Sequence, residues 1–282
     1  MSSNPAELRP ATADRAALVV SEVRPNLPRT LIALDFDGTL APIVSRPADA
    51  RLIDGADQVL RLLVARGASV AIITGRDAET VLDLSGLADL PGLAVAGLYG
   101  AQVWRGGRLA TTPPPPELTR ARSALPELVR AVSSELWIED KGLSLVVHAR
   151  GVDEPDAAID ALRPSVEKLA QSLSSEGGLE VHAGRQVLEL RLAGFDKGRA
   201  LREFVDAFGD ASDRQLLYAG DDVGDLPAFA VVQQLREAGR RAWAVGVGST
   251  EVTWMPADDS RVDAVVDGPA GLLSLLRGLL GG

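Results

Sequence analysis

Apolar runs of strand length alternate with amphipathic stretches of helix length from Thr30 onward, and this alternation constrains the fold more than any other feature of the sequence. The pattern is typical of βα units, in which a helix connects each strand of a parallel sheet to the next. The predicted strands cover residues 31–36, 68–73, 93–99, 102–104, 108–110, 215–219, 242–247 and 264–266. The predicted helices cover residues 54–66, 197–208, 226–238 and 270–280. We therefore expect an α/β fold built on a doubly wound parallel sheet.

Four consecutive prolines, Pro113–Pro116, interrupt this pattern. Proline has no backbone N–H, so we expect the run to form a stiff, extended connector rather than helix or central strand. After it the pattern changes to helices at 118–134 and 155–173 and strands at 136–140, 143–149, 179–183 and 187–192. We predict a separate α+β unit over residues 113–194, inserted into a core of residues 30–112 and 195–282. Residues 1–29 are expected to form a loose N-terminal arm.

The composition excludes several classes of site and partner. The 282 residues correspond to about two domains. The chain has no Cys and only two His, His148 and His182, which excludes disulfides, thiolate nucleophiles and zinc centres built on these residues. The formal net charge of −10 and the lack of a basic patch argue against nucleic-acid binding. No apolar run is long enough to span a bilayer and no export signal is apparent, so we expect a cytoplasmic monomer or weak oligomer with no membrane contact.

Polar side chains cluster just after three of the predicted strands. The segments are Asp35-Phe36-Asp37-Gly38-Thr39, Thr74-Gly75-Arg76 and Gly220-Asp221-Asp222-Val223-Gly224-Asp225. In doubly wound sheets, ligands bind outside the carboxyl ends of the strands. Carboxylates that converge there repel one another unless a divalent cation neutralises them, and Mg²⁺ is the natural occupant of an all-oxygen site. A phosphate beside the metal would be bound by the Thr74 hydroxyl, the Lys197 ammonium and backbone N–H groups near Gly38.

Each segment taken alone has a simpler interpretation. Asp35 and Asp37 alone fit an acidic turn, or the manganese-binding Asp-x-Asp of a glycosyltransferase. Thr74 fits the N-cap of the following helix, and Asp222 and Asp225 fit first-turn carboxylates that favour a helix dipole. The order of the segments along the chain favours the catalytic interpretation.

Together with Lys197, these segments resemble the four ordered motifs of the haloacid-dehalogenase-like (HAD) phosphatases. The resemblance implies a Rossmann-like HAD core in which Asp35 is the nucleophile that becomes an aspartyl-phosphate and Asp37 is the general acid and base. The implied catalytic residues are Asp35, Asp37, Thr74 and Lys197. The implied magnesium ligands are Asp35, the carbonyl oxygen of Asp37, Asp221 and Asp225. Gly38 and Arg76 are assigned to substrate binding, with pairing to a nearby acid as the alternative for Arg76.

The inserted unit resembles the cap domain of trehalose-6-phosphate phosphatases. The residues that carry this resemblance, and that we assign to substrate binding, are Glu139, Lys141, Ser144, His148, Arg150, Gly184 and Glu189. Tyr99-Gly100-Ala101-Gln102 stands where that family usually has His-Gly-x-Glu, and further departures occur at Ala149, Leu192, Gly224, Leu226 and Pro227. Solvated strand-face charges are the alternative for Glu139, Lys141 and Glu189, and a core position is the alternative for His148. Trp104 and Trp137 are expected to serve packing.

The resemblance implies a magnesium-dependent phosphatase that acts on the phosphate monoester of a disaccharide, with trehalose 6-phosphate as the first candidate. A related sugar or pseudo-disaccharide phosphate is the nearest alternative. From other classes, a phosphomutase and a catalytically silent sugar-phosphate binding protein remain open. The presence of Asp at position 37 favours hydrolysis, because relatives that keep their phosphoenzyme for other purposes often lack a carboxylate there.

Overall fold

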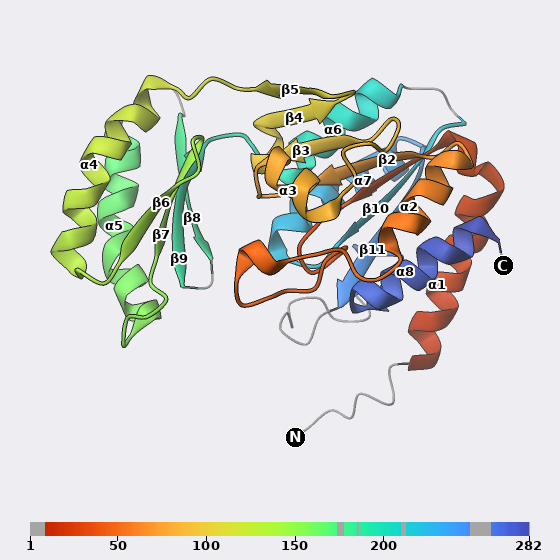
Figure 1. Cartoon of the computed structure of the whole chain (residues 1–282), viewed down its shortest axis with the longest axis horizontal. Coiled ribbons are helices and arrows are strands. Elements are labelled where there is room, and N and C mark those ends of the chain that lie inside the picture. The colour runs from red at the N-terminus through yellow and green to blue at the C-terminus, as the bar shows by residue number, and fades with distance from the viewer. Residues whose placement is uncertain (1–8, 174–177, 185, 210–212, 249–260, 282) are drawn as a thin grey trace. The chain divides into compact units, whose positions relative to one another are not determined.

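The computed structural model describes residues 9–173, 178–184, 186–209, 213–248 and 261–281 (Figure 1). They divide into two compact units. One unit takes its described residues from Met1–Ala110 and Asp196–Gly282, and the other takes them from Thr111–Phe195. None of the described helices is both long and apolar enough to cross a membrane.

An eight-stranded sheet forms the centre of the first unit, in the order β12-β11-β10-β1-β2-β3-β4-β5. Its strands are β1 (Thr30–Leu34), β2 (Ser69–Ile73), β3 (Ala94–Gly97), β4 (Gln102–Arg105), β5 (Arg108–Thr111), β10 (Gln215–Gly220), β11 (Arg241–Gly248) and β12 (Ala264–Asp267). The pairs from β12 through to β3 are parallel, and β4 is antiparallel to β3. The chain winds outward from β1 in both directions, which confirms the predicted doubly wound α/β fold with a mixed edge.

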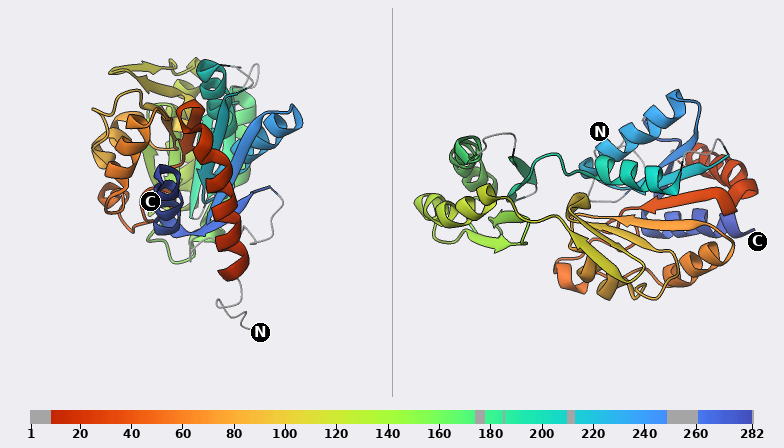
Figure 2. Two further views of the ribbon diagram at one scale, coloured as in Figure 1. Left: turned by 90° about the vertical axis from the view of Figure 1, so that its right-hand side faces the viewer. Right: turned by 90° about the horizontal axis from the view of Figure 1, so that it is seen from above.

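Helices cover both faces of this sheet, as two further views show (Figure 2). The helices α1 (Arg9–Val23), α2 (Ala56–Ala65), α3 (Ala78–Ser85) and α8 (Gly268–Leu280) pack on one face, and α6 (Lys197–Phe208) and α7 (Leu226–Glu237) pack on the other. Successive side chains of a strand point to opposite faces, so Ile32 and Leu34 join the first cluster, whereas Leu31 and Ala33 join the second. In the described residues, the connections contain four 3₁₀ turns: η1 (Arg24–Arg29), η2 (Pro47–Asp49), η3 (Leu98–Gly100) and η4 (Val223–Asp225).

The predicted loose N-terminal arm is wrong for residues 9–29. Residues 9–23 form α1, which contacts β12 and α8. Val19 and Val23, one helical turn apart, are buried in the core, and the side chain of Gln215 donates a hydrogen bond to the Val23 carbonyl oxygen at 2.7 Å. The short apolar pieces are therefore one face of a docked helix. Residues 1–8 lie outside the described part.

The second unit is a four-stranded antiparallel sheet in the order β6-β7-β9-β8, with two helices packed on one face. Its elements are α4 (Pro116–Val132), β6 (Trp137–Asp140), β7 (Ser144–His148), α5 (Pro155–Leu173), β8 (Leu179–Gly184) and β9 (Val187–Leu192). The expectation that no residue of the proline run is helical is wrong for the last one. Pro116 is the first residue of α4, a position whose N–H has no partner within the helix in any case.

Candidate active site

Three neighbouring strands of the first unit end in the polar segments noted in the sequence. Because β10, β1 and β2 are parallel neighbours, their carboxyl ends meet at one edge of the sheet. Asp35 lies just beyond β1, Thr74 just beyond β2 and Asp221 just beyond β10. The strands β2 and β3 follow on one side of β1, and β10, β11 and β12 follow on the other side. The carboxyl end of β1 is therefore the switch point at which doubly wound sheets bind ligands. Lys197 opens α6, which is capped by the side chain of Asp196.

A buried cluster of opposite charges occupies this edge. The relative exposures of Asp35, Lys197, Asp221 and Asp225 are 3%, 4%, 3% and 0%. The Lys197 ammonium lies 2.9 Å from Oδ1 of Asp35 and 2.9 Å from Oδ1 of Asp225. One oxygen each from Asp35, Asp221 and Asp225 lies within 4.8 Å of the others. Oδ1 of Asp222 lies 3.6 Å from the same ammonium, so four carboxylates share one positive charge and the cluster carries an excess of negative charge.

The protonation preferences of the cluster follow from this excess. Burial, followed by repulsion from Asp222 and Asp225, raises the pKa of Asp221 to about 7. Burial also raises the pKa of Asp35 and of Asp225, although Lys197 opposes the rise in both. Burial lowers the pKa of Lys197, but attraction from Asp225 and Asp35 outweighs it and holds that pKa well above its usual value. The lysine therefore stays charged while the carboxyls compete for protons.

The residues present fit a hard divalent cation. Carboxylate oxygens that are buried together and short of positive charge are the donor set that Mg²⁺ prefers. Gly38 keeps space beside them, because a Cβ at this position would lie 2.0 Å from Oδ2 of Asp221. Thr39 is fully buried and its hydroxyl lies 3.3 Å from Oδ1 of Asp221. The sequence placed Thr39 in the motif without a role, and the structure shows that it contacts the carboxylate.

Asp225 organises the loop that follows β10. Lys197 and Tyr218 donate hydrogen bonds to its Oδ1 atom. The backbone N–H groups of Asp221 and Asp222 donate to its Oδ2 atom, each at 3.0 Å. Direct coordination of a metal by Asp225 stays a prediction, because both of its oxygens already accept hydrogen bonds. Sequence reasoning missed Tyr218, whose hydroxyl within a buried strand was the available signal.

Asp37 is held by Arg76. The guanidinium donates from Nε to Oδ2 of Asp37 at 2.6 Å and from Nη2 to Oδ1 at 2.7 Å. Its Nη1 atom donates to the carbonyl oxygen of Pro47 at 2.7 Å. The structure thus shows the acid pairing that the sequence left as an alternative for Arg76, while its assignment to substrate binding stays a prediction.

Thr74 is buried in the turn after β2. Its hydroxyl accepts a hydrogen bond from the backbone N–H of Arg76 at 3.1 Å. The alternative interpretation of Thr74 as a helix N-cap is wrong, because Asp77 caps α3 by accepting from the N–H of Thr80. Asp225 lies in the first turn of η4, as its simpler interpretation expected, whereas Asp222 is the N-cap of that turn.

The residues assigned to sugar binding belong to the second unit, described here by itself. Its sheet carries Glu139, Ser144, His148, Gly184 and Glu189 on the face opposite α4 and α5. Lys141 lies in the turn after β6, and Arg150 lies just beyond β7. The expectation that both tryptophans serve packing is confirmed for Trp104, which packs against the core of the first unit. It holds only in part for Trp137, whose ring stacks against His148 but which is 49% exposed.

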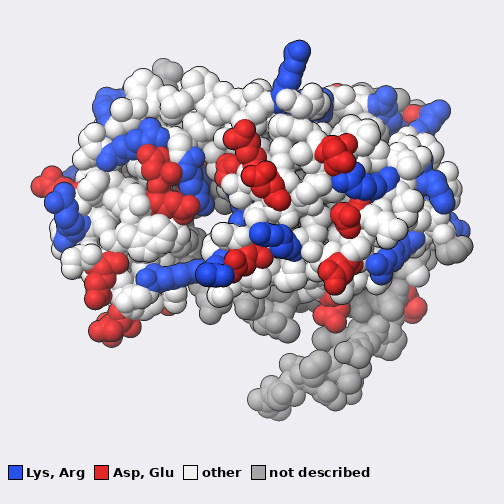
Figure 3. Space-filling model, viewed as in Figure 1, with Lys and Arg blue, Asp and Glu red and all other residues white. Residues whose placement is uncertain are grey.

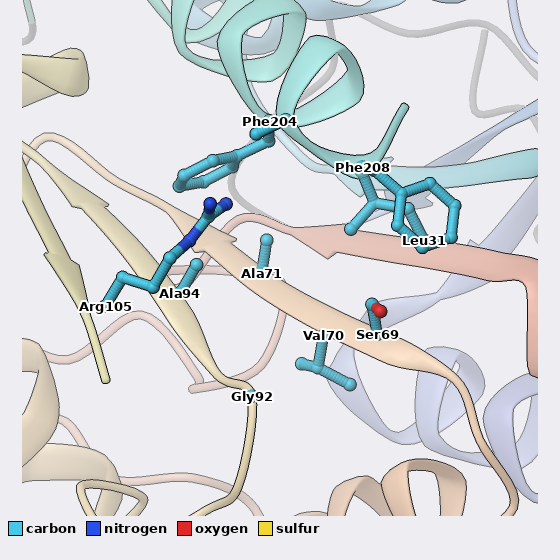
Figure 4. Close-up of a pocket in the computed structure, with 10 residues that line it drawn as sticks. Leu31, Ser69, Val70, Ala71, Gly92, Ala94, Arg105, Phe204 and Phe208 are labelled. Atoms are coloured by element: carbon cyan, nitrogen blue, oxygen red, sulfur yellow. The ribbon is translucent and has the colours of Figure 1, made fainter. Parts of the chain in front are cut away.

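A cavity of about 180 Å³ lies at the opposite end of the same strands (Figure 4). It is lined by Leu31, Ser69, Val70, Ala71, Gly92, Ala94, Arg105, Phe204, Ala207 and Phe208. None of the predicted site residues lines it. On the face drawn in Figure 3, Lys and Arg side chains are interspersed with Asp and Glu and form no continuous basic area among the described residues.

Known proteins resemble this chain over most of its length. The family model described as trehalose-phosphatase matches residues 33–264. A trehalose-phosphate phosphatase of Mycobacterium marinum is 32% identical over 217 residues, which cover 73% of this chain and 52% of the relative. A protein of Mycobacterium tuberculosis named an uncharacterized glycosyl hydrolase is 35% identical over 215 residues, which cover 73% of this chain and 15% of the relative. The chain thus spans about half the length, or less, of these curated relatives.

A solved structure shares the fold. The C-terminal domain of a Candida albicans trehalose-6-phosphate phosphatase superposes with a TM-score of 0.72 at 20% identity, covering 94% of this chain and 96% of that chain. At this identity the likeness shows the fold alone.

Proposed function

The chain belongs to the trehalose-phosphatase family of the HAD superfamily, and from this premise we propose that it is a magnesium-dependent phosphatase that converts trehalose 6-phosphate to trehalose and phosphate. The observation that carries the proposal is the buried cluster in which Lys197 lies 2.9 Å from Asp35 and from Asp225, with Asp221 beside them. An anionic nucleophile that attacks a phosphate dianion needs positive charge nearby, which Lys197 supplies in part and a bound Mg²⁺ would complete.

In the proposed reaction, a carboxylate oxygen of Asp35 forms a bond to phosphorus as the bond from phosphorus to the sugar oxygen breaks. Asp37 gives its proton to the departing sugar oxygen. Asp37 then takes a proton from water, whose oxygen bonds to phosphorus and displaces the carboxylate of Asp35. Bound Mg²⁺ would supply positive charge that offsets the repulsion between the nucleophile and the phosphate. Lys197 holds Asp35 in place and adds to this neutralisation.

Arg76 holds Asp37 in place for these steps. Each oxygen of Asp37 accepts one hydrogen bond from Arg76, and because a carboxylate oxygen has two lone pairs, each keeps a site for the leaving group or for water. We therefore propose that Arg76 orients the general acid during turnover.

The proposal assigns recognition of the sugar to the inserted unit, through Glu139, Lys141, Ser144, His148, Arg150, Gly184 and Glu189. The polar face of its sheet and the family match support this assignment. The glycosyl hydrolase name of one relative adds no second candidate, because the chain spans 15% of that protein.

A phosphate-release assay over a panel of sugar phosphates tests the reaction. Trehalose 6-phosphate should be the preferred substrate, excess EDTA should abolish turnover and Mg²⁺ should restore it. Asp35→Asn removes the attacking anion at nearly constant shape, so turnover should fall by at least about three orders of magnitude. Full activity in EDTA, or a tenth of wild-type activity in Asp35→Asn, would contradict the proposal. Continuous release of inorganic phosphate separates a hydrolase from a mutase.

Two variants of the inserted unit test recognition. Lys141→Ala and Glu189→Ala remove hydrogen bonds to sugar hydroxyls that a small aryl phosphate lacks. Losing one hydrogen bond to a desolvated charged partner costs about 1.5 to 3 kcal/mol, so kcat/KM for the disaccharide phosphate should fall roughly 10- to 150-fold. Activity on the aryl phosphate should stay within about 2-fold of wild type. If kcat/KM fell equally for both substrates, Lys141 and Glu189 would have a structural role and no role in recognising the sugar.

A further inference from the structure

The sheet of the second unit has one face that α4 and α5 leave uncovered. Leu145, Val147, Leu188 and Leu190 point into the core beneath the helices. Because side chains alternate along each strand, the residues between them point the other way. Among the described residues of this second face are Trp137, Glu139, Ser144, His148 and Glu189. It combines an aromatic side chain with several hydrogen-bonding groups.

Trp137 is the most exposed large side chain on this face, and its neighbours hold it in place. It lies directly opposite His148 in the register of β6 and β7. The two rings are stacked, with centroids 3.9 Å apart and planes inclined by 6°. Nε2 of His148 lies 2.9 Å from Oε2 of Glu139, which limits rotation of the imidazole. One face of the indole is therefore covered by His148, and the side chain remains 49% exposed.

One polar group on the same face lacks the partner that burial normally requires. Ser144 is 4% exposed, yet its hydroxyl has no hydrogen-bond partner among the described residues. Buried hydroxyls are usually hydrogen-bonded, so this one indicates a ligand or a water that completes it. Glu189 lies in the neighbouring strand, with Val146 opposite it in the register. Carboxylates and hydroxyls at such positions accept hydrogen bonds from the hydroxyls of a polyol.

We propose that the exposed side of Trp137 is a stacking platform for one pyranose ring of the substrate, and that His148 and Glu139 are positioning residues that hold the indole flat. This inference rests on the proposed function and deepens it. A pyranose presents an apolar face of C–H groups and a polar rim of hydroxyls. The flat indole buries the apolar face, while Glu189, on the same face of the sheet, binds hydroxyls of the disaccharide.

The proposal also changes the expected roles of two residues. Glu139 and His148 were assigned to direct contact with substrate, but Oε2 of Glu139 and Nε2 of His148 are already in contact with each other. Both act on the sugar through the orientation of Trp137. Removing His148 should therefore weaken binding of the sugar only in a protein that still has the indole.

Binding of trehalose to the inactive Asp35→Asn protein, measured by calorimetry and tryptophan fluorescence, tests the platform without catalysis. Trehalose should bind and change the emission, whereas inorganic phosphate should not change the emission of Trp137. In the same background, Trp137→Ala should raise the Kd for trehalose about 10-fold, because the apolar face of the sugar stays in water. Trp137→Phe keeps a flat ring and should stay within about 3-fold of the parent Kd. Leu62→Ala, which truncates an exposed apolar side chain on α2, is the matched control and should have no effect.

Kinetics provide the second measurement. With the active enzyme, Trp137→Ala should raise KM for trehalose 6-phosphate about 10-fold with kcat within about 2-fold of wild type, and should leave an aryl phosphate unaffected. His148→Ala should raise KM by less, and should add nothing further when combined with Trp137→Ala. Urea unfolding of each variant reports on folding separately from binding.

The outcomes separate the two proposals. A Trp137→Ala protein that binds trehalose as tightly as Leu62→Ala would overturn the platform, as would a Trp137→Phe protein as impaired as Trp137→Ala. Additive effects of His148→Ala and Trp137→Ala would overturn the positioning role. If the wild type hydrolyses trehalose 6-phosphate in any of these cases, the proposed function stands. Failure of the wild type to hydrolyse it would refute the proposed function, while the calorimetry still decides the platform.

Discussion

Asp221→Asn should stabilise the metal-free protein at pH 8 even though it alters a residue of the candidate active site. Burial, then repulsion from Asp222 and Asp225, raises the pKa of Asp221 from its ordinary value of 3.8 to about 7. At pH 8 the folded chain must therefore hold an ionised carboxylate where ionisation is disfavoured. Asparagine keeps the shape and an oxygen acceptor for the Thr39 hydroxyl, 3.3 Å away in the wild type, but carries no charge.

The size of the effect follows from proton linkage. Between pH 3.8 and about 7 the folded protein keeps the proton of Asp221 while the unfolded chain has lost it, so the free energy of unfolding falls as pH rises through this interval. With these two pKa values, the loss between pH 5 and pH 8 is about 3 kcal/mol for this carboxyl alone. The raised pKa values of Asp35 and Asp225, which burial causes, act in the same direction.

Urea unfolding in EDTA at pH 5 and pH 8 measures this difference. The wild type should lose about 3 kcal/mol more than Asp221→Asn between the two pH values. Asp57→Asn, which changes an exposed aspartate on α2, should behave like the wild type. Mg²⁺ at 100 times its Kd should restore about 2.7 kcal/mol to the wild type at pH 8, and almost nothing to the variant. Equal pH dependence of the two proteins in EDTA would refute the argument from burial, and equal stabilisation by Mg²⁺ would refute the metal assignment.

Three further substitutions test other contacts of the site. Lys197→Met leaves Asp35, 2.9 Å away, without its buried counter-charge, so urea unfolding at pH 8 in EDTA should show a loss of about 3 to 5 kcal/mol; a loss below about 1 kcal/mol would contradict the ion-pair argument. Gly38→Ala places a Cβ 2.0 Å from Oδ2 of Asp221, so phosphate release should fall about 100-fold or more in a folded protein, and near-normal turnover would be inconsistent with this packing. Arg76→Ala removes the two hydrogen bonds that orient the general acid Asp37, so turnover of a sugar phosphate, whose leaving oxygen needs a proton, should fall about 10-fold, whereas an aryl phosphate should lose less than about 3-fold; equal losses would argue against a role through proton transfer.

The sequence determined most of the elements and their order, because their signals are local, although α1 was expected as a loose arm. The helices at Pro155–Leu173 and Lys197–Phe208 have the predicted bounds. Apolar periodicity, a proline at the start of one helix and a capping carboxylate before the other are all read within a few residues. The order of the polar segments was enough to bring Asp35, Thr74 and Asp221 to one edge, because parallel strands of a doubly wound sheet end on the same side.

Contacts between residues far apart in the chain were decided by the tertiary structure. The residues next to an arginine in the sequence do not show whether it binds substrate or pairs with a carboxylate. The fold places Arg76 against Asp37, which is 39 positions away. Trp137 shows the same limit within the inserted unit. An aromatic residue in a strand is expected to pack, and only the positions of α4 and α5 decide which face of the sheet they cover. Secondary structure depends on neighbours along the chain, whereas the partner of a side chain depends on where distant segments meet, and that is a property of the whole fold.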